Sequence, residues 1–157
     1  EFGDERADYA SALKKHYTEG APPDWSLNHV TAYASCHPWE DWAETWAHYL
    51  HMTDTLDTAK SFGLRSDGLG LVIQPFSAAI LGPSCPRSGE FLNLLNQWMQ
   101  ITGVLNELSR SMGVPDFYPF VLSAPAVRKL HLVHRIISHK TPRSARRRTR
   151  PAAPAQS

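Results

Sequence analysis

Apolar residues recur at spacings of three and four along much of the chain, which is the pattern of helices with one buried face. The clearest stretch, residues 89–112, places its apolar residues at Phe91, Leu94, Leu95, Trp98, Ile101, Leu105 and Leu108. Gly113 and Pro115 follow this stretch and predict the end of a helix, because glycine favours the conformation after a last turn and proline cannot continue it. The whole pattern predicts helices over residues 5–18, 26–34, 38–60, 89–112 and 123–138.

The helical pattern stops over residues 61–88, where glycine and proline are frequent. This composition predicts an irregular loop, with a short apolar strand or turn at 69–73. The fold class expected is therefore mainly α: a helical bundle with an irregular Gly/Pro-rich middle loop. Residues 1–140 are expected to form one domain, and residues 141–157, rich in Arg, Pro and Ala, a disordered tail. The expected core consists of Trp39, Trp42, Trp46, Phe91, Trp98 and the aliphatic residues of the last helix.

Charge and cysteine usage narrow the classes of function. The 157 residues have a formal net charge of +1, but five arginines and no acid lie in residues 143–157, so the remainder is net negative. A nucleic-acid or membrane partner has no electrostatic support in such a body. Cys36 and Cys85 form no C-x-x-C pair and no disulfide framework, which favours a reducing compartment. No apolar run is long enough to span a membrane. We therefore expect a cytoplasmic protein. The chain has no initiating Met, so we expect it to begin in the middle of a longer protein.

The helix predicted at 38–60 carries the residues most suited to chemistry. Over residues 33–51, with about 100° between successive residues, the carboxylate and imidazole groups other than Asp41 share an arc under 90° wide. Three tryptophans lie opposite, which suggests that the helix is packed into a core. A buried carboxylate is costly unless it is paired or binds a metal, so the arc is a candidate metal or proton-transfer site, and a solvated polar face is the alternative. The arc contains Glu40, Glu44, His48 and His51, and also His37 if the helix reaches it.

The segment Glu40-Asp-Trp-Ala-Glu44 resembles the E-[DE]-[FW]-[AF]-E helix of gluzincin-type zinc peptidases. The resemblance implies that Glu40 is the third zinc ligand and that Glu44 orients a ligand histidine through a hydrogen bond. Tyr33 lies seven residues before Glu40, as does a tyrosine in the lethal-factor-like branch, which implies that Tyr33 faces the reacting carbonyl. The resemblance assigns no role to His48 or His51; these two and His37 are possible site-lining residues.

Two longer blocks, residues 33–59 and 105–125, look like the "putative zinc-binding metallopeptidase" family of bacteria. The resemblance extends over roughly residues 1–138 and implies that this chain is the C-terminal subdomain of a zincin-like enzyme that uses Zn²⁺ to hydrolyse a peptide or protein substrate. An H-E-x-x-H helix, which supplies two histidine ligands and the general base in such enzymes, does not occur in these 157 residues. We therefore expect it upstream in a longer protein, and we expect this chain alone to be inactive and not to bind zinc tightly.

Two alternatives remain open at this point. The chain can be a non-catalytic helical module for protein interaction that keeps the fold of the family. It can also hold a separate metal site built from Glu40, Glu44, His48 and His51 on one helix. His37 precedes Pro38, and its simplest role is to cap the helix.

Overall fold

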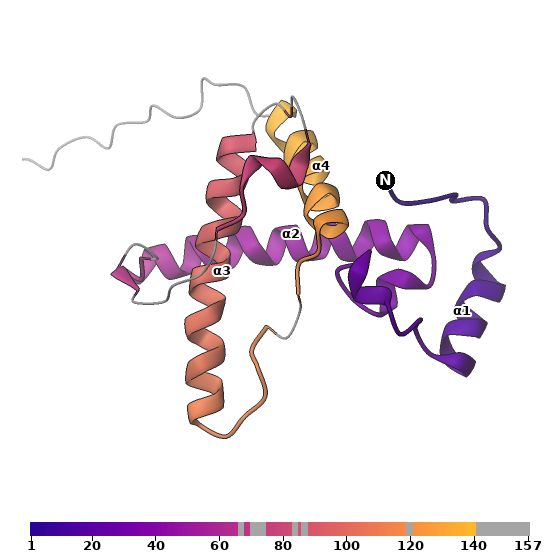
Figure 1. The fold of residues 1–157 in the computed structure, drawn as a ribbon, viewed down its shortest axis with the longest axis horizontal. Helices are drawn as coiled ribbons and strands as arrows, with labels where there is room; N and C mark the ends of the chain where they lie inside the picture. The colour runs from indigo at the N-terminus through magenta and orange to yellow at the C-terminus, as the bar shows by residue number, and fades with distance from the viewer. Residues whose placement is uncertain (66–67, 70–74, 83–84, 86–87, 119–120, 141–157) are drawn as a thin grey trace, which may run out of the picture.

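The computed structural model describes residues 1–65, 68–69, 75–82, 85, 88–118 and 121–140 (Figure 1). Within these residues the fold is mainly helical, as predicted, and contains no strand. Its elements are α1 (Tyr9–Glu19), η1 (Trp25–Leu27), η2 (Tyr33–Ser35), α2 (Pro38–Ser61), η4 (Ala78–Leu81), α3 (Ser88–Ser111) and α4 (Ala124–Lys140). The possible strand at 69–73 and the tail at 141–157 lie largely or wholly outside the described residues.

Helix α2 runs through the middle of the fold, and the other elements are arranged along it (Figure 1). Helix α3 crosses it, α4 packs beside it, and η2 packs against its N-terminal end. Helix α1 lies at that N-terminal end, away from α3 (Figure 1). The two ends of α2 therefore have different surroundings: a bundle contact toward its C-terminal half, and short N-terminal segments around its first turns. No helix among the described residues is long and apolar enough to cross a membrane.

The start of α2 is fixed by its own sequence. His37 is the N-cap, and its Nδ1 accepts a hydrogen bond from the amide of Trp39 at 3.1 Å. Its Nε2 lies 3.0 Å from the carbonyl oxygen of Ala7, so the imidazole caps the helix and also ties down the N-terminal segment. Pro38 occupies the first turn, where its missing N–H leaves no bond unmade. The expected capping role of His37 is confirmed.

The main core lies where α2, α3, α4 and η4 meet. Trp98 and Phe91 of α3 are buried in it, as predicted, and the aliphatic residues of α4 fill the other side. Burying each such side chain fully contributes roughly 1.5–3 kcal/mol. The fully or nearly fully buried members are Tyr49, Met52, Leu81, Phe91, Leu92, Leu95, Trp98, Leu122, Val127, Leu130 and Val133.

The predicted orientation of α2 is wrong. Trp39 and Trp42 are 56% and 39% exposed, and only Trp46 of the three tryptophans packs against the main core. The buried face is instead a mixed one, rotated from the tryptophans toward the polar arc. It consists of Asp41, Thr45, His48, Tyr49, Met52 and Ala59. Tryptophan content indicated that α2 is apolar on one side, but it did not indicate which side the other helices cover.

Three further expectations are corrected in detail. The helix predicted at 26–34 is two separate single turns, η1 and η2. The first helix begins at Tyr9 rather than at residue 5, because the Asp8 side chain accepts a hydrogen bond from the amide of Ser11 and caps it there. Leu108, expected in the buried stripe of α3, is 53% exposed, since α3 extends past α2 and its last turns are not covered (Figure 1).

Candidate functional site

Glu40 lies in the first turn of α2, with its side chain partly buried. The hydroxyl of Tyr9, in the first turn of α1, donates a hydrogen bond to Glu40 Oε1 at 2.6 Å. The ring of Tyr9 also packs against His37 and Trp39, with centroids 5.2 and 5.5 Å away. One tyrosine therefore joins α1 to the start of α2 and touches the candidate zinc ligand directly.

Tyr33, in η2, lies on the same side of the domain as Glu40. Burial raises the pKa of Tyr33 well above its ordinary value, and the negative charge of Glu40 raises it further. The phenol is therefore protonated at neutral pH and can donate a hydrogen bond. Its ring contacts that of His16 in α1 at 5.6 Å between centroids, so α1 borders both Tyr33 and Glu40.

Glu44 follows Glu40 by one turn and is also partly buried. The hydroxyl of Thr31 donates to Glu44 Oε2 at 2.9 Å, and the same hydroxyl oxygen accepts the amide of Ala34 at 3.0 Å. Thr31 thus fixes both the η2 turn and one oxygen of the Glu44 carboxylate. The position of Glu44 depends on the segment before η2 as well as on α2.

Cys36 precedes α2 and belongs to the same surroundings. Desolvation raises the pKa of its thiol, and the negative charges of Glu40 and then Glu44 raise it further. The sulfur is therefore a neutral thiol at physiological pH. We use "the Glu40 edge" for this set of residues: Tyr9, Thr31, Tyr33, Cys36, Glu40 and Glu44.

Sequence reasoning missed Tyr9, Thr31 and Cys36. Tyr9 is 31 positions from Glu40 and Thr31 is 13 positions from Glu44, so no helical periodicity relates them. Cys36 is four positions before Glu40, and its nearness to that residue was the one relation visible from spacing along the chain.

Of the three histidines proposed as possible site-lining residues, His37 contacts Tyr9 of the Glu40 edge, whereas His48 and His51 lie further along α2. His37 caps α2, as described above. His48 is buried on the core side of α2, where its Nδ1 lies 2.9 Å from the carbonyl oxygen of Glu44 and its ring contacts Tyr118. Burial lowers the pKa of His48 below its ordinary value. His51 is exposed, with its ring 6.1 Å from that of His48.

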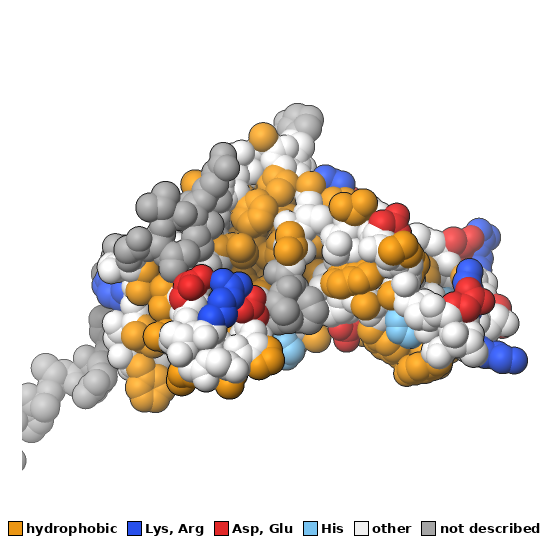
Figure 2. All heavy atoms as spheres, turned by 60° about the horizontal axis from the view of Figure 1, so that its bottom comes forward, with side chains coloured by type: hydrophobic (Ala, Val, Ile, Leu, Met, Phe, Trp, Pro, Cys, Tyr) orange, Lys and Arg blue, Asp and Glu red, His pale blue; other side chains and the backbone are white. Residues whose placement is uncertain are grey.

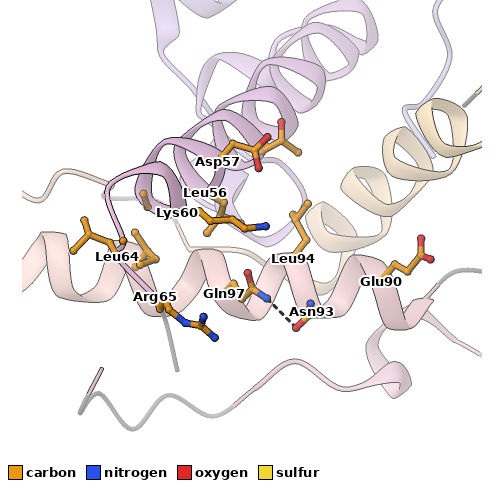
Figure 3. Close-up of a pocket in the computed structure, with 13 residues that line it drawn as sticks. Leu56, Asp57, Lys60, Leu64, Arg65, Glu90, Asn93, Leu94 and Gln97 are labelled. Atoms are coloured by element: carbon orange, nitrogen blue, oxygen red, sulfur yellow. Dashed lines mark hydrogen bonds between the residues drawn. The ribbon is translucent and has the colours of Figure 1, made fainter. Parts of the chain in front are cut away.

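A cleft of about 800 Å³ lies between the C-terminal half of α2 and the first half of α3. Asp57 and Lys60 of α2 face Glu90, Asn93 and Gln97 of α3 across it (Figure 3). The cleft is some distance from the Glu40 edge, because Asp57 is about 25 Å along the helix from Glu40 at the usual rise per residue. A smaller depression of about 480 Å³ between α1 and η2 includes Cys36 in its lining and therefore borders the Glu40 edge.

The geometry of the Glu40 edge can be set beside known proteins. Over residues 1–136 the chain matches the model of a family described as "putative zinc-binding metallo-peptidase". The chain belongs to this family. Uncharacterized proteins of Mycobacterium bovis and Mycobacterium tuberculosis are 41% identical to it over 141 residues, which is 90% of this chain and 38% of each relative. The chain thus spans little more than a third of the length of these relatives. No solved structure matches it.

The zinc implied by this metallopeptidase family can be tested against the residues of the Glu40 edge. Glu40 Oε1 is occupied by Tyr9, while no hydrogen bond to Oε2 forms within the described residues. One free carboxylate oxygen suffices for a zinc ligand. The described part of the chain contains no group of three His, Cys, Asp or Glu residues that could hold a metal ion. Glu40 thus fits as one zinc ligand, and the described residues do not place two further ligands beside it.

The alternative metal site on one helix is not formed within the described residues. Its four members diverge, because Glu40 and Glu44 lie at the Glu40 edge, His48 is buried toward Tyr118, and His51 is exposed. Glu40 and His51 are also about 16 Å apart along the helix at the usual rise per residue, which is too far for ligands of one ion.

Proposed function

We propose that this chain supplies one side of the active site of a zinc-dependent peptidase. Glu40 is the third zinc ligand, Glu44 accepts a hydrogen bond from a ligand histidine and fixes its tautomer, and Tyr33 donates to the oxyanion formed from the scissile carbonyl. The observation that carries the proposal is that Glu40 and Tyr33 lie close together. Tyr9 borders both residues, and the charge of Glu40 raises the pKa of Tyr33. Family membership supports it independently.

The residues of the Glu40 edge suit these roles chemically. When bound, zinc activates a water molecule and polarises a carbonyl. Tyr9 holds one oxygen of Glu40 and leaves the other for the metal. Thr31 holds Oε2 of Glu44 and leaves Oε1 for a histidine N–H. Tyr33 keeps its proton at neutral pH, so its hydroxyl acts as a hydrogen-bond donor toward developing negative charge.

The remaining parts of the site are assigned to a partner segment. We propose that an H-E-x-x-H helix upstream in the parent protein provides two histidine ligands and the general base, and that the substrate is a peptide or protein. The greater length of the mycobacterial relatives supports an additional segment. This chain alone is then expected to be inactive. Both described cysteines are free thiols, which supports a cytoplasmic location.

The zinc content of the full-length protein tests the assignment of Glu40. Glu40→Ala is expected to strip zinc from the purified protein, and Glu40→Gln to weaken its binding, because each removes a charged oxygen ligand. Asp54→Asn is the matched control, since Asp54 is an exposed carboxylate further along the same helix. Stoichiometric zinc in both Glu40 variants would rule out the ligand assignment.

The Tyr33 hydroxyl is tested by kinetics on a peptide substrate. Tyr33→Phe removes only the hydroxyl, and the loss of one donor to an oxyanion typically lowers kcat by about 10²–10³-fold. KM and zinc content are expected to stay near the wild-type values. A variant with wild-type kcat would remove Tyr33 from the mechanism while leaving Glu40 in place.

A non-catalytic interaction module is the second candidate function. The exposure of Trp39, Trp42 and Leu50 along α2 favours it, because apolar side chains of this size on one helix are typical of a contact surface. The two candidates separate in the zinc measurement: a full-length protein that binds no zinc and cleaves no peptide supports the module.

A further inference from the structure

A buried ion pair lies immediately behind the Glu40 edge. Asp41 follows Glu40 on α2, and Lys129 comes from α4; their side chains are only 1% and 5% exposed. Lys129 Nζ donates to Asp41 Oδ2 at 2.5 Å and to the carbonyl oxygen of Asn28 at 2.7 Å. His29 Nδ1 lies 3.4 Å from the same Asp41 oxygen.

The lysine therefore contacts two of the chain segments that carry the groups of the Glu40 edge, α2 and the segment before η2. Through Asp41 it holds the first turn of α2, which contains Glu40. Through Asn28 it holds the segment leading to Thr31, whose hydroxyl donates to Glu44. One side chain on α4 thus relates the positions of the two carboxylates, although it touches neither.

Packing alone does not require charges at this place. The neighbours of Lys129 on α4, Val127 and Leu130, are fully buried apolar residues. A buried ion pair gains little net stability over apolar residues of similar volume, because both charges lose their hydration. Asp41 Oδ1 is also buried without a hydrogen-bond partner in the described chain, which reduces the gain further. The pair instead fixes a geometry, because Lys129 Nζ, Asp41 Oδ2 and the carbonyl oxygen of Asn28 must meet within hydrogen-bond distance.

We propose that Lys129, together with Asp41, is a positioning pair that sets Glu40 and Glu44 for zinc binding. This inference rests on the proposed function. It predicts that the pair contributes to zinc affinity beyond its contribution to stability, because a small shift of either carboxylate weakens a metal site. Outer groups that orient metal ligands are typically worth about 10–100-fold in metal affinity.

The test compares two variants of the full-length protein. Lys129→Met/Asp41→Asn removes both charges together, so that no lone charge stays buried. Leu130→Ala is the matched control, because it weakens the packing of α4 at the adjacent buried position without touching the pair. Zinc affinity is measured by competition with a chelator, and hydrogen exchange of residues 28–37 is followed by mass spectrometry, both where each protein is fully folded.

The double variant is expected to raise the zinc Kd by about tenfold or more and to speed exchange in residues 28–37. Leu130→Ala is expected to lower the Tm while leaving zinc affinity unchanged. Wild-type affinity in the double variant, or an equal loss in Leu130→Ala, overturns the proposal. If the double variant does not fold, Lys129→Arg provides the test, because it keeps both charges but changes the geometry of the donor; a smaller rise in Kd is expected, and an unchanged Kd overturns the proposal.

A parallel measurement on Glu40→Ala separates the two levels of inference. Loss of zinc in that variant with wild-type affinity in the double variant removes only the positioning role. Unchanged zinc in Glu40→Ala removes the proposed function and this inference with it.

Discussion

At the level of single residues, the carboxylates of the Glu40 edge are held by hydroxyl groups rather than by cations. Tyr9 donates to Glu40 and Thr31 donates to Glu44, whereas the lysine bonded to Asp41 is on the core side of α2. A hydroxyl satisfies an acceptor oxygen without cancelling its charge. Glu40 and Glu44 therefore keep the negative potential that attracts a metal cation, and the buried cation Lys129 is paired with Asp41 instead.

His48 gives a prediction on pH dependence. Burial lowers its pKa in the folded chain below the ordinary value of 6.5, so the unfolded chain binds a proton more readily. The free energy of unfolding is therefore expected to fall as the pH is lowered through about 6.5 toward the pKa of the folded state. In His48→Gln, chemical denaturation at a series of pH values should show a flatter dependence over this window.

The variant has a second, pH-independent effect. At pH 8 its stability is expected to be lower by about 1 kcal/mol, because the hydrogen bond to the Glu44 carbonyl is altered. His51→Gln, at an exposed site three residues further on, is the control for removing an imidazole from α2. An unchanged slope in His48→Gln would show that another group causes the pH dependence.

At the level of elements, the boundaries of the long helices α2, α3 and α4 were predictable, and the orientation of α2 was not. His37-Pro38 and Gly113 encode the start of α2 and the end of α3 within a few residues, and both boundaries were found to within one residue. The buried face of α2 mixes Asp41 and Thr45 with Tyr49 and Met52, so hydrophobicity alone could not identify it. Which face is covered depends on α3 and α4, far away in the sequence.

The same limit applies to the candidate site. Glu40, Glu44 and Tyr33 were found because they fall in one continuous segment that resembles a known motif. Tyr9 and Lys129 were not, since the contacts that give them a role span 31 and 88 positions. Contacts of that range follow from tertiary packing, which a single sequence does not specify locally.

The turn that follows α3 is held in place by hydrogen bonds to the helix. Gly113 has φ +73°, and its amide and that of Val114 bond back to Arg110 and Ser109. Asn106 then fastens the following segment, because its side chain bonds to both the amide and the carbonyl of Tyr118 at 2.9 Å. The turn after α3 is thereby held against the helix itself.

Gly113→Ala is expected to lower stability by about 1 kcal/mol, since an L side chain in the left-handed region costs about 1–2 kcal/mol and the stiffer unfolded chain recovers part of it. A Cβ at this position meets no atom within 4 Å, so the loss comes from the backbone alone. Thermal unfolding measures it. Gly89→Ala, at an equally open position within the first turn of α3, should leave stability equal or higher; a loss of similar size there would contradict the explanation.

At the level of the whole molecule, large apolar side chains are exposed in two places, near the start of α2 and around the end of α3. Trp39 and Trp42 lie on α2, and Leu108, Met112 and Phe117 lie at or after the end of α3, all more than a third exposed. The face that includes the bottom of Figure 1 shows extensive hydrophobic areas (Figure 2). Contiguous apolar areas of this kind mark contact surfaces or promote association.

The isolated chain is accordingly expected to self-associate. Met112→Gln/Phe117→Ser should weaken the association constant by about tenfold or more, because burying each large apolar side chain contributes roughly 1.5–3 kcal/mol. Sedimentation equilibrium measures the constant. Leu27→Gln, at an exposed apolar position away from Met112 and Phe117, should leave the association constant unchanged. A chain that remains monomeric at high concentration would contradict the expectation.

The contact between the rings of Tyr9 and Trp39 allows the intrinsic fluorescence of the protein to report on Glu40. Tyr9 touches the Glu40 carboxylate with its hydroxyl and the indole of Trp39 with its ring. A cation that binds Oε2 of Glu40 draws charge from the carboxylate that accepts the Tyr9 hydrogen bond, and this alters the surroundings of that indole. Tryptophan emission, compared between the native sequence and Trp39→Phe, can therefore follow titration of the carboxylate by a metal without any added dye.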